Sequence, residues 1–167
     1  MPNTSTVSAA YSSSMNVTET FSIANAADNT ILVTDVSETG TLTASTAVPA
    51  TQQTQYDLTL TAGSGSIDLT ALPGLNANET IDGTGLKLQL FKFLNPTSNA
   101  NTMTVAKGAS NGYGLSAAGG AWSVIISPGQ SVLVVSQDVA PDVASGARII
   151  DVTGTGSQVL TVGVVLG

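Results

Sequence analysis

Residues 86–95 read Leu-Lys-Leu-Gln-Leu-Phe-Lys-Phe-Leu-Asn and hold more apolar bulk than any other run of the chain. Leucine occupies positions 86, 88, 90 and 94, with Lys92 interrupting the row, while the alternate positions change from polar residues to Phe91 and Phe93. This period of two predicts a strand with one face buried throughout and the other covered only towards its end.

The two faces of this strand lead to two expectations. We expect Leu86, Leu88 and Leu90 to belong to the core, because they share one face. We expect Phe91 and Phe93 to be covered either by a long loop or by another subunit.

Short runs of alternating apolar residues recur between turn-forming residues along the rest of the chain. They lie at residues 17–23, 31–36, 56–60, 103–105, 122–126, 132–135, 149–152 and 159–166. No segment keeps the 3.6-residue rhythm of a helix. Roughly eight to ten short strands at this spacing predict an all-β protein, an antiparallel β-sandwich with jelly-roll-like topology.

The clearest predicted hairpin joins residues 122–126 to residues 132–135. Pro128-Gly129 fits the two middle positions of a type II turn between them. Trp122 is in phase with the apolar residues of the first strand, which favours a place in the core over a ligand platform. The last strand is predicted to present four apolar residues to the core: Leu160, Val162, Val164 and Leu166.

The chain is predicted to divide into an N-terminal arm, residues 1–14, and a single β-sandwich domain, residues 15–167. The arm is rich in Ser and Thr and has too little apolar bulk to fold alone, so it is expected to be flexible or bound to a partner. Tyr11 and Met15 are the bulky side chains that this region offers for contacts.

Composition excludes several classes of function. Charged residues make up 9% of the chain and hydrophobic residues 42%, which suits a subunit whose surface is covered by neighbours. Four cations against 11 acids give a net charge of −7, so we expect no nucleic-acid binding. The absence of Cys and His removes thiolate and imidazole chemistry, including disulfides.

No catalytic residue, metal ligand or cofactor site is predicted. The loop at residues 76–83 holds oxygen ligands but lacks the spacing of a calcium loop, so Asp82-Gly83 is better explained as a turn. The remaining acids are scattered and do not form a positioned pair. Tyr113, between two glycines in the loop at residues 108–120, is expected to project and make contacts.

The N-terminal residues lack the positive and apolar regions of a secretory signal, and no apolar run is long enough to span a membrane. We therefore expect a protein made in the cytoplasm of its producer and not embedded in a membrane.

Three segments resemble small virion proteins of tailed bacteriophages. They are residues 86–96, the run Thr102-Met103-Thr104-Val105-Ala106-Lys107-Gly108, and residues 122–129, which close at Pro128-Gly129. The closing strands at residues 151–167 also fit, so the resemblance extends from Leu69 onward. It implies a jelly-roll-like fold and a role as a capsid decoration or cementing protein on the outer capsid surface.

The leading hypothesis is a non-enzymatic virion protein, made in the host cytoplasm, whose partners are the capsid protein and copies of itself in a homotrimer. Its contacts are expected from Tyr11, Met15 and Tyr113. One alternative is a host-glycan-binding module of a phage spike or fibre, acting through Tyr113. Another is a shell protein that assembles by itself.

Overall fold

The computed structural model describes residues 6–21, 30–47, 49–74, 79–136 and 139–167, and of residues 16–21 and 30–35 it describes the backbone alone. These residues form strands and turns, and none of them lies in a helix. The predicted all-β class is therefore confirmed.

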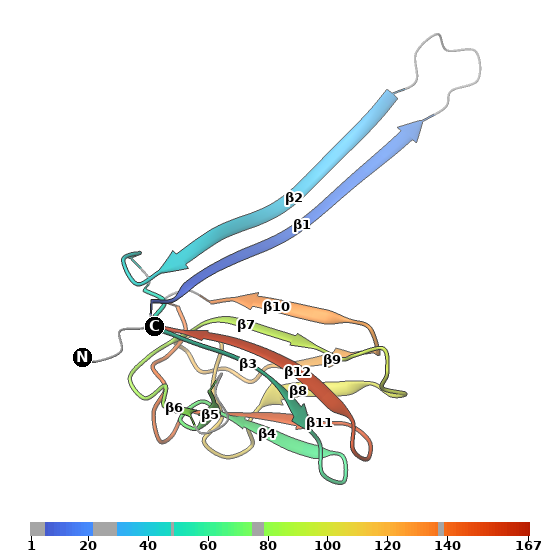
Figure 1. The fold of residues 1–167 in the computed structure, drawn as a ribbon. Helices are drawn as coiled ribbons and strands as arrows, with labels where there is room; N and C mark the ends of the chain where they lie inside the picture. The colour runs from blue at the N-terminus through green and yellow to red at the C-terminus, as the bar shows by residue number, and fades with distance from the viewer. Residues whose placement is uncertain (1–5, 22–29, 48, 75–78, 137–138) are drawn as a thin grey trace.

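Eight strands build two four-stranded antiparallel sheets that face each other (Figure 1). In order, the first sheet contains β10 (Ser131–Val135), β7 (Leu88–Leu94), β12 (Val159–Leu166) and β3 (Gln52–Thr59). The second sheet contains β4 (Ser64–Asp68), β11 (Ile149–Thr153), β8 (Met103–Lys107) and β9 (Ser123–Ile126). Two short strands, β5 (Leu72–Pro73) and β6 (Thr80–Ile81), pair with each other. This arrangement is the predicted antiparallel β-sandwich.

The pairing of the eight strands is nested. β3 pairs with β12, β4 with β11, β7 with β10, and β8 with β9, so the first strand of the sandwich meets the last. Two further pairings, β7 with β12 and β8 with β11, complete the sheets. This is the strand order of a jelly roll, in which a long antiparallel hairpin folds over itself to give two sheets.

The turn at Pro128-Gly129 forms, but the hairpin predicted around it is wrong. The N–H of Gln130 donates to the carbonyl oxygen of Ser127 at 3.0 Å, and Gly129 has the positive φ, 83°, that a type II turn requires. However, β9 pairs with β8, and β10 pairs with β7. The turn therefore carries the chain from one sheet to the other.

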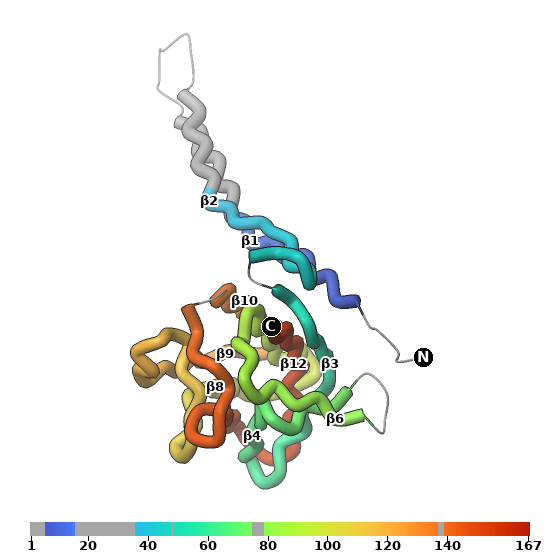
Figure 2. The backbone as a smooth tube through the Cα atoms, turned by 90° about the vertical axis from the view of Figure 1, so that its left-hand side faces the viewer, coloured from blue at the N-terminus to red at the C-terminus, as the bar shows by residue number. Residues whose placement is uncertain are grey.

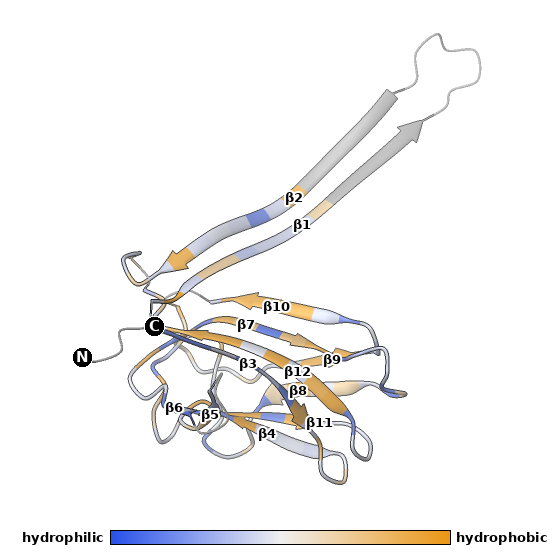
Figure 3. Ribbon diagram, in the orientation of Figure 1, coloured by the Kyte–Doolittle hydropathy of each residue, from blue (hydrophilic) through white to orange (hydrophobic). Residues whose placement is uncertain are grey.

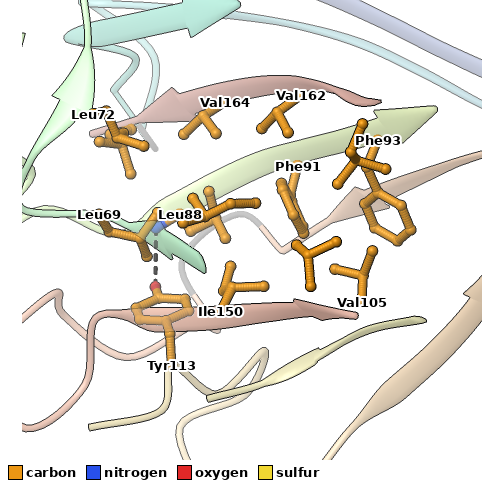
Figure 4. Close-up of a cluster of buried hydrophobic side chains, with 14 of the residues drawn as sticks. Leu69, Leu72, Leu88, Phe91, Phe93, Val105, Tyr113, Ile150, Val162 and Val164 are labelled. Atoms are coloured by element: carbon orange, nitrogen blue, oxygen red, sulfur yellow. Dashed lines mark hydrogen bonds between the residues drawn. The ribbon is translucent and has the colours of Figure 1, made fainter. Parts of the chain in front are cut away.

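The core lies between the two sheets, and β12 contributes to it as predicted (Figure 4). The side chains of β12 that point inward are Leu160, Val162, Val164 and Leu166, each of which is buried. Trp122 is half-buried and packs against the same core, so its predicted core role is also confirmed.

Strand β7 changes phase at Gln89. Leu88 pairs with Leu166 of β12, whereas Leu90 pairs with Val165, so Gln89 is the extra residue of a β-bulge. As a result, Leu88 lies in the core between the sheets, but Leu90 lies in a separate cluster outside it. The expectation that the leucine row shares one core is therefore wrong for Leu90, because the bulge turns it to the other face.

Beyond the bulge, Phe91 and Phe93 enter the core. Both side chains are fully buried, and their ring centroids lie 4.9 Å apart. They belong to the same cluster as Val105 and Ile150 of the second sheet, which Figure 4 shows on the opposite side of the core. The two expected covers, a long loop or another subunit, are therefore wrong, because the second sheet covers these rings.

A long hairpin precedes the sandwich and projects from it on the side of the first sheet (Figures 1 and 2). β1 (Ser8–Phe21) pairs with β2 (Thr30–Thr43) over the whole length of both strands. We expected the first strand to begin near Val17. β1 instead begins at Ser8, so residues 8–14 of the predicted arm lie inside a paired strand, and residues 1–5 lie outside the described residues.

Truncation of a core ring tests the phase of β7. Phe91→Ala is expected to lower the free energy of unfolding by about 3–5 kcal/mol, because it removes a buried ring and leaves a cavity. Ile125→Ala in β9 is the control, because Ile125 is 69% exposed and its loss is expected to change stability by about 0.5 kcal/mol or less. Urea denaturation measures both, and equal losses would contradict the assignment.

Candidate interaction surface

Tyr113 does not project from its loop. Its side chain is fully buried, and its hydroxyl donates to the carbonyl oxygen of Pro141 at 2.6 Å while accepting the N–H of Leu88 at 3.0 Å. Trp122 Nε1 donates to the carbonyl oxygen of Tyr113 at 2.9 Å. The prediction of an exposed contact residue is therefore wrong for Tyr113.

The glycines beside Tyr113 serve close packing and not exposure of the ring. A Cβ at Gly112 would lie 2.6 Å from Cγ of Lys107, and a Cβ at Gly114 would lie 2.7 Å from Cα of Gly119. The loop thus packs its backbone against neighbouring chain, which leaves the ring between the glycines directed into the sandwich.

Burial changes the acidity of Tyr113. Removal of the hydroxyl from water raises the pKa of Tyr113 from 10.0 to about 12, although the hydrogen bond from the Leu88 backbone opposes this shift. Burial raises the pKa of Tyr56 to about 12 as well. Both phenols therefore keep their protons in the folded protein at pH values where they ionise in the unfolded chain.

The base of the hairpin is anchored to the outer face of the first sheet by a second apolar cluster. Its buried members are Val7, Leu42, Ala50, Leu90 and Val165, and Ala9, Tyr11 and Val135 pack against them. Figure 3 shows hydrophobic residues at this end of the hairpin, where it meets the sandwich. Because burial of these side chains removes apolar surface from water, the cluster holds the base of the hairpin to the sandwich.

Tyr11 lies across Gly40 of the neighbouring strand. The two residues are opposite in register, and a Cβ at position 40 would lie 2.6 Å from Cε1 of Tyr11. An aromatic ring laid over a glycine on the adjacent strand is a known way to stabilise a strand pair. Tyr11, a predicted interaction residue, is therefore half-buried and packs within the base of the hairpin.

A wedge-shaped cavity of about 380 Å³ lies between the hairpin and the outer face of the first sheet. One wall is β1, from Ser8 to Ser12. The floor crosses all four strands of the sheet and includes Leu133, Lys92, Gly163 and Gln55.

Met15 and Val36 form an exposed apolar pair further along the hairpin. They are opposite in register, and their side chains are 56% and 61% exposed. Alternate residues of a strand share a face, so Val36 lies on the same face of β2 as Gly40 and Leu42 at the base. Met15, predicted from sequence, is thus exposed for contact, whereas Val36 was not predicted as a contact residue, because its place opposite Met15 depends on the register of the two strands.

Among the described residues, three of the four cations have a local partner. Lys87 lies 3.1 Å from Asp142 and Arg148 lies 3.2 Å from Asp68. Lys107 donates to the carbonyl oxygen of Gly119. Lys92, in the floor of the wedge cavity, is exposed and lies in no ion pair that the described residues form.

The loop considered for a metal is a turn at its described end. Asp82 Oδ1 accepts hydrogen bonds from Thr84 N, at 2.9 Å, and from Thr84 Oγ1, at 2.6 Å, which lowers the pKa of Asp82. Residues 76–78 of this loop lie outside the described residues. Within the described ranges, no three carboxylates or other acidic ligands gather into a group that would hold a metal.

Comparisons with protein-family models, with curated proteins and with solved structures found no match for this chain. In the part of the chain that the structure describes, no helix is long and apolar enough to cross a membrane. The features that bear on function are therefore the anchored hairpin, its exposed apolar pair and the wedge cavity.

Removal of the Tyr113 hydroxyl tests its buried role. Tyr113→Phe leaves the buried N–H of Leu88 without its acceptor, so the free energy of unfolding is expected to fall by about 1–3 kcal/mol at neutral pH. Between pH 10 and about 12 only the unfolded chain loses the Tyr113 proton, so wild-type stability falls as pH rises. This fall is expected to be shallower in the variant.

Denaturation at a series of pH values measures both effects. Tyr56→Phe is the control for the slope, because it removes the other phenol of raised pKa without breaking the Leu88 contact. A Tyr113→Phe variant with wild-type stability and wild-type alkaline slope would contradict the buried role.

Proposed function

We propose that this chain is a non-enzymatic structural protein of a virion, which binds the outer capsid surface as a decoration or cementing subunit. The observation that supports this proposal is the hairpin, anchored at its base by a buried cluster and carrying Met15 and Val36 exposed beyond the sandwich. The sandwich is the rigid body, and the hairpin reaches from it to neighbouring subunits.

The stability of the hairpin supports a role in assembly. A two-stranded ribbon is marginally stable in water by itself, and both of its edges offer unpaired backbone groups to another strand. β1 and β2 form such a ribbon over 14 residues each. Contact with a capsid protein covers the apolar pair and adds hydrogen bonds at an edge, so binding stabilises the outer hairpin.

Charge and resemblance support the outer surface of the virion as the location. The net charge of −7 disfavours a position against packaged nucleic acid, since both carry the same sign. The resemblance to small virion proteins of tailed bacteriophages, from Leu69 onward, covers the strands that form most of the sandwich. In this proposal the protein acts as a homo-oligomer, a trimer, in contact with the capsid protein.

The expectation on which the glycan-binding alternative was based does not hold. It depends on the ring of Tyr113 as an exposed platform, and that ring is fully buried beneath its loop. The shell-forming alternative is separated from the proposal by experiment, because a shell protein assembles into closed particles or tubes without another capsid protein.

Shortening of the hairpin tests the proposed function. Ser13 and Glu38 are opposite in register, so an Asn-Gly turn between them replaces residues 14–37 and keeps the anchored base. The shortened protein is expected to fold, and its affinity for virions of its own source is expected to fall at least about tenfold. Co-sedimentation with purified virions measures the binding.

Ile125→Ser is the matched control, because it removes an exposed apolar side chain from the second sheet, away from the hairpin. Electron cryo-microscopy of the virion gives the location, and density for the sandwich is expected on the outer surface. Equal binding by the shortened protein, or no binding by the full chain, would overturn the proposal.

A further inference from the structure

We propose that the wedge cavity receives the outer part of the hairpin of a second copy of this chain, with Lys92 of one copy facing Glu38 of the other. This inference rests on the homo-oligomer in the proposed function and assigns the surface that forms it.

The floor of the cavity is a straight row across the first sheet. Leu133 of β10 is opposite Lys92 of β7, Lys92 is opposite Gly163 of β12, and Gly163 is opposite Gln55 of β3. The next row, towards the base, includes Leu90 and Val165 and is covered by the hairpin of the same chain. The sheet thus has one row that its own hairpin covers and one that borders the open wedge.

Gly163 is the first observation that supports the approach of another chain to this row. It lies in the middle of β12, its φ is not positive, and a Cβ there would meet nothing nearer than Lys92 at 3.9 Å. Neither the backbone conformation nor the packing of its own chain therefore requires glycine, although glycine weakens a strand. Glycine inside a strand also marks places where another backbone comes close, and here that place is the open wedge.

Charge complementarity identifies the second chain. The chain has no Lys or Arg before Lys87, so its hairpin contributes acids and no cations. Lys92 lies in the wedge without an ion-pair partner among the described residues, and Glu38 is exposed on β2. The hairpin of another copy therefore offers a negative surface to the one cation of the floor.

The spacing along the hairpin matches the spacing along the outer face of β7. Glu38 and Val36 are two residues apart on one face of β2, as Lys92 and Leu94 are on the outer face of β7, and two strand residues span about 6.8 Å. With Glu38 over Lys92, the exposed pair of Val36 and Met15 reaches Leu94, a half-buried leucine on the same outer face of β7, just beyond the lining of the cavity. Acid meets cation and apolar side chains meet apolar side chains in one register.

The hairpin of the same chain does not make this contact. Its β1 wall lines the cavity only as far as Ser12, and Glu38, opposite Ser13, lies beyond that wall. A closed symmetric oligomer, in which each copy gives its hairpin and receives another, repeats the contact once per subunit and leaves no hairpin unpaired.

A charge exchange tests the contact. Sedimentation velocity of the purified full chain is expected to show a discrete oligomer whose association weakens at high salt. Lys92→Glu and Glu38→Lys are each expected to weaken association about tenfold, because both place like charges together. The double variant K92E/E38K is expected to return to within about threefold of the wild type, because the pair is restored with its signs reversed.

Steric block of the row is the second test. Gly163→Leu is expected to leave the monomer folded, by circular dichroism and urea denaturation, and to abolish association, whereas Gly163→Ala weakens it less. Lys92→Gln is expected to weaken association, and Ser123→Glu, on the second sheet, is its control, because each lowers the net charge by one unit and only Lys92 lies in the wedge.

The inference is overturned by a wild-type chain that stays monomeric at every concentration, or by an oligomer that Lys92→Glu and Gly163→Leu leave intact. It is also overturned if the charge exchange restores only the stability of a monomer, since the hairpin then closes on its own sheet. Self-association is measured without virions, so its failure is distinguishable from a failure of virion binding by the same proteins.

Discussion

The β-bulge at Gln89 is the constraint on which the arrangement of this protein depends. One inserted residue turns Phe91 and Phe93 towards the core and leaves Leu90 on the opposite face of the first sheet. β7 is consequently covered on its inner face by the second sheet and, at Leu90, on its outer face by the base of the hairpin. Without the phase change, the two rings would face outward and Leu90 would leave the cluster that anchors the hairpin.

The anchored base and the projecting end of the hairpin have different physical requirements. The base is stabilised by its own chain, through the second apolar cluster and the ring of Tyr11 over Gly40. The projecting end has two open edges and the exposed pair of Met15 and Val36, so by itself it is only marginally stable. This division explains why one continuous ribbon serves both as part of the folded subunit and as its proposed means of assembly.

Local sequence signals predicted local structure well and pairing poorly. The type II turn at Pro128-Gly129 and the inward face of β12 were both predictable, because turn chemistry and strand alternation depend on adjacent residues. The partner of β10 was not, since nested pairing joins it to β7, and β8 and β9 lie between these two strands in the sequence. The same limit applies to Tyr113, whose glycine neighbours suggested exposure. In the fold its hydroxyl donates a hydrogen bond to the carbonyl oxygen of Pro141, which is distant in the sequence.

The sequence by itself determined the all-β class, the positions of most strands and the absence of Cys and His chemistry, because composition and a period of two are properties of the chain. It also predicted Met15 as a contact residue, and Met15 is exposed in the structure. Only the tertiary structure decided that residues 8–14 belong to a paired strand and that Lys92 and Gly163 lie side by side under a hairpin. Those facts depend on the register between segments that are distant in the sequence. Burial of the whole core selects this register, and no single stretch of sequence encodes it.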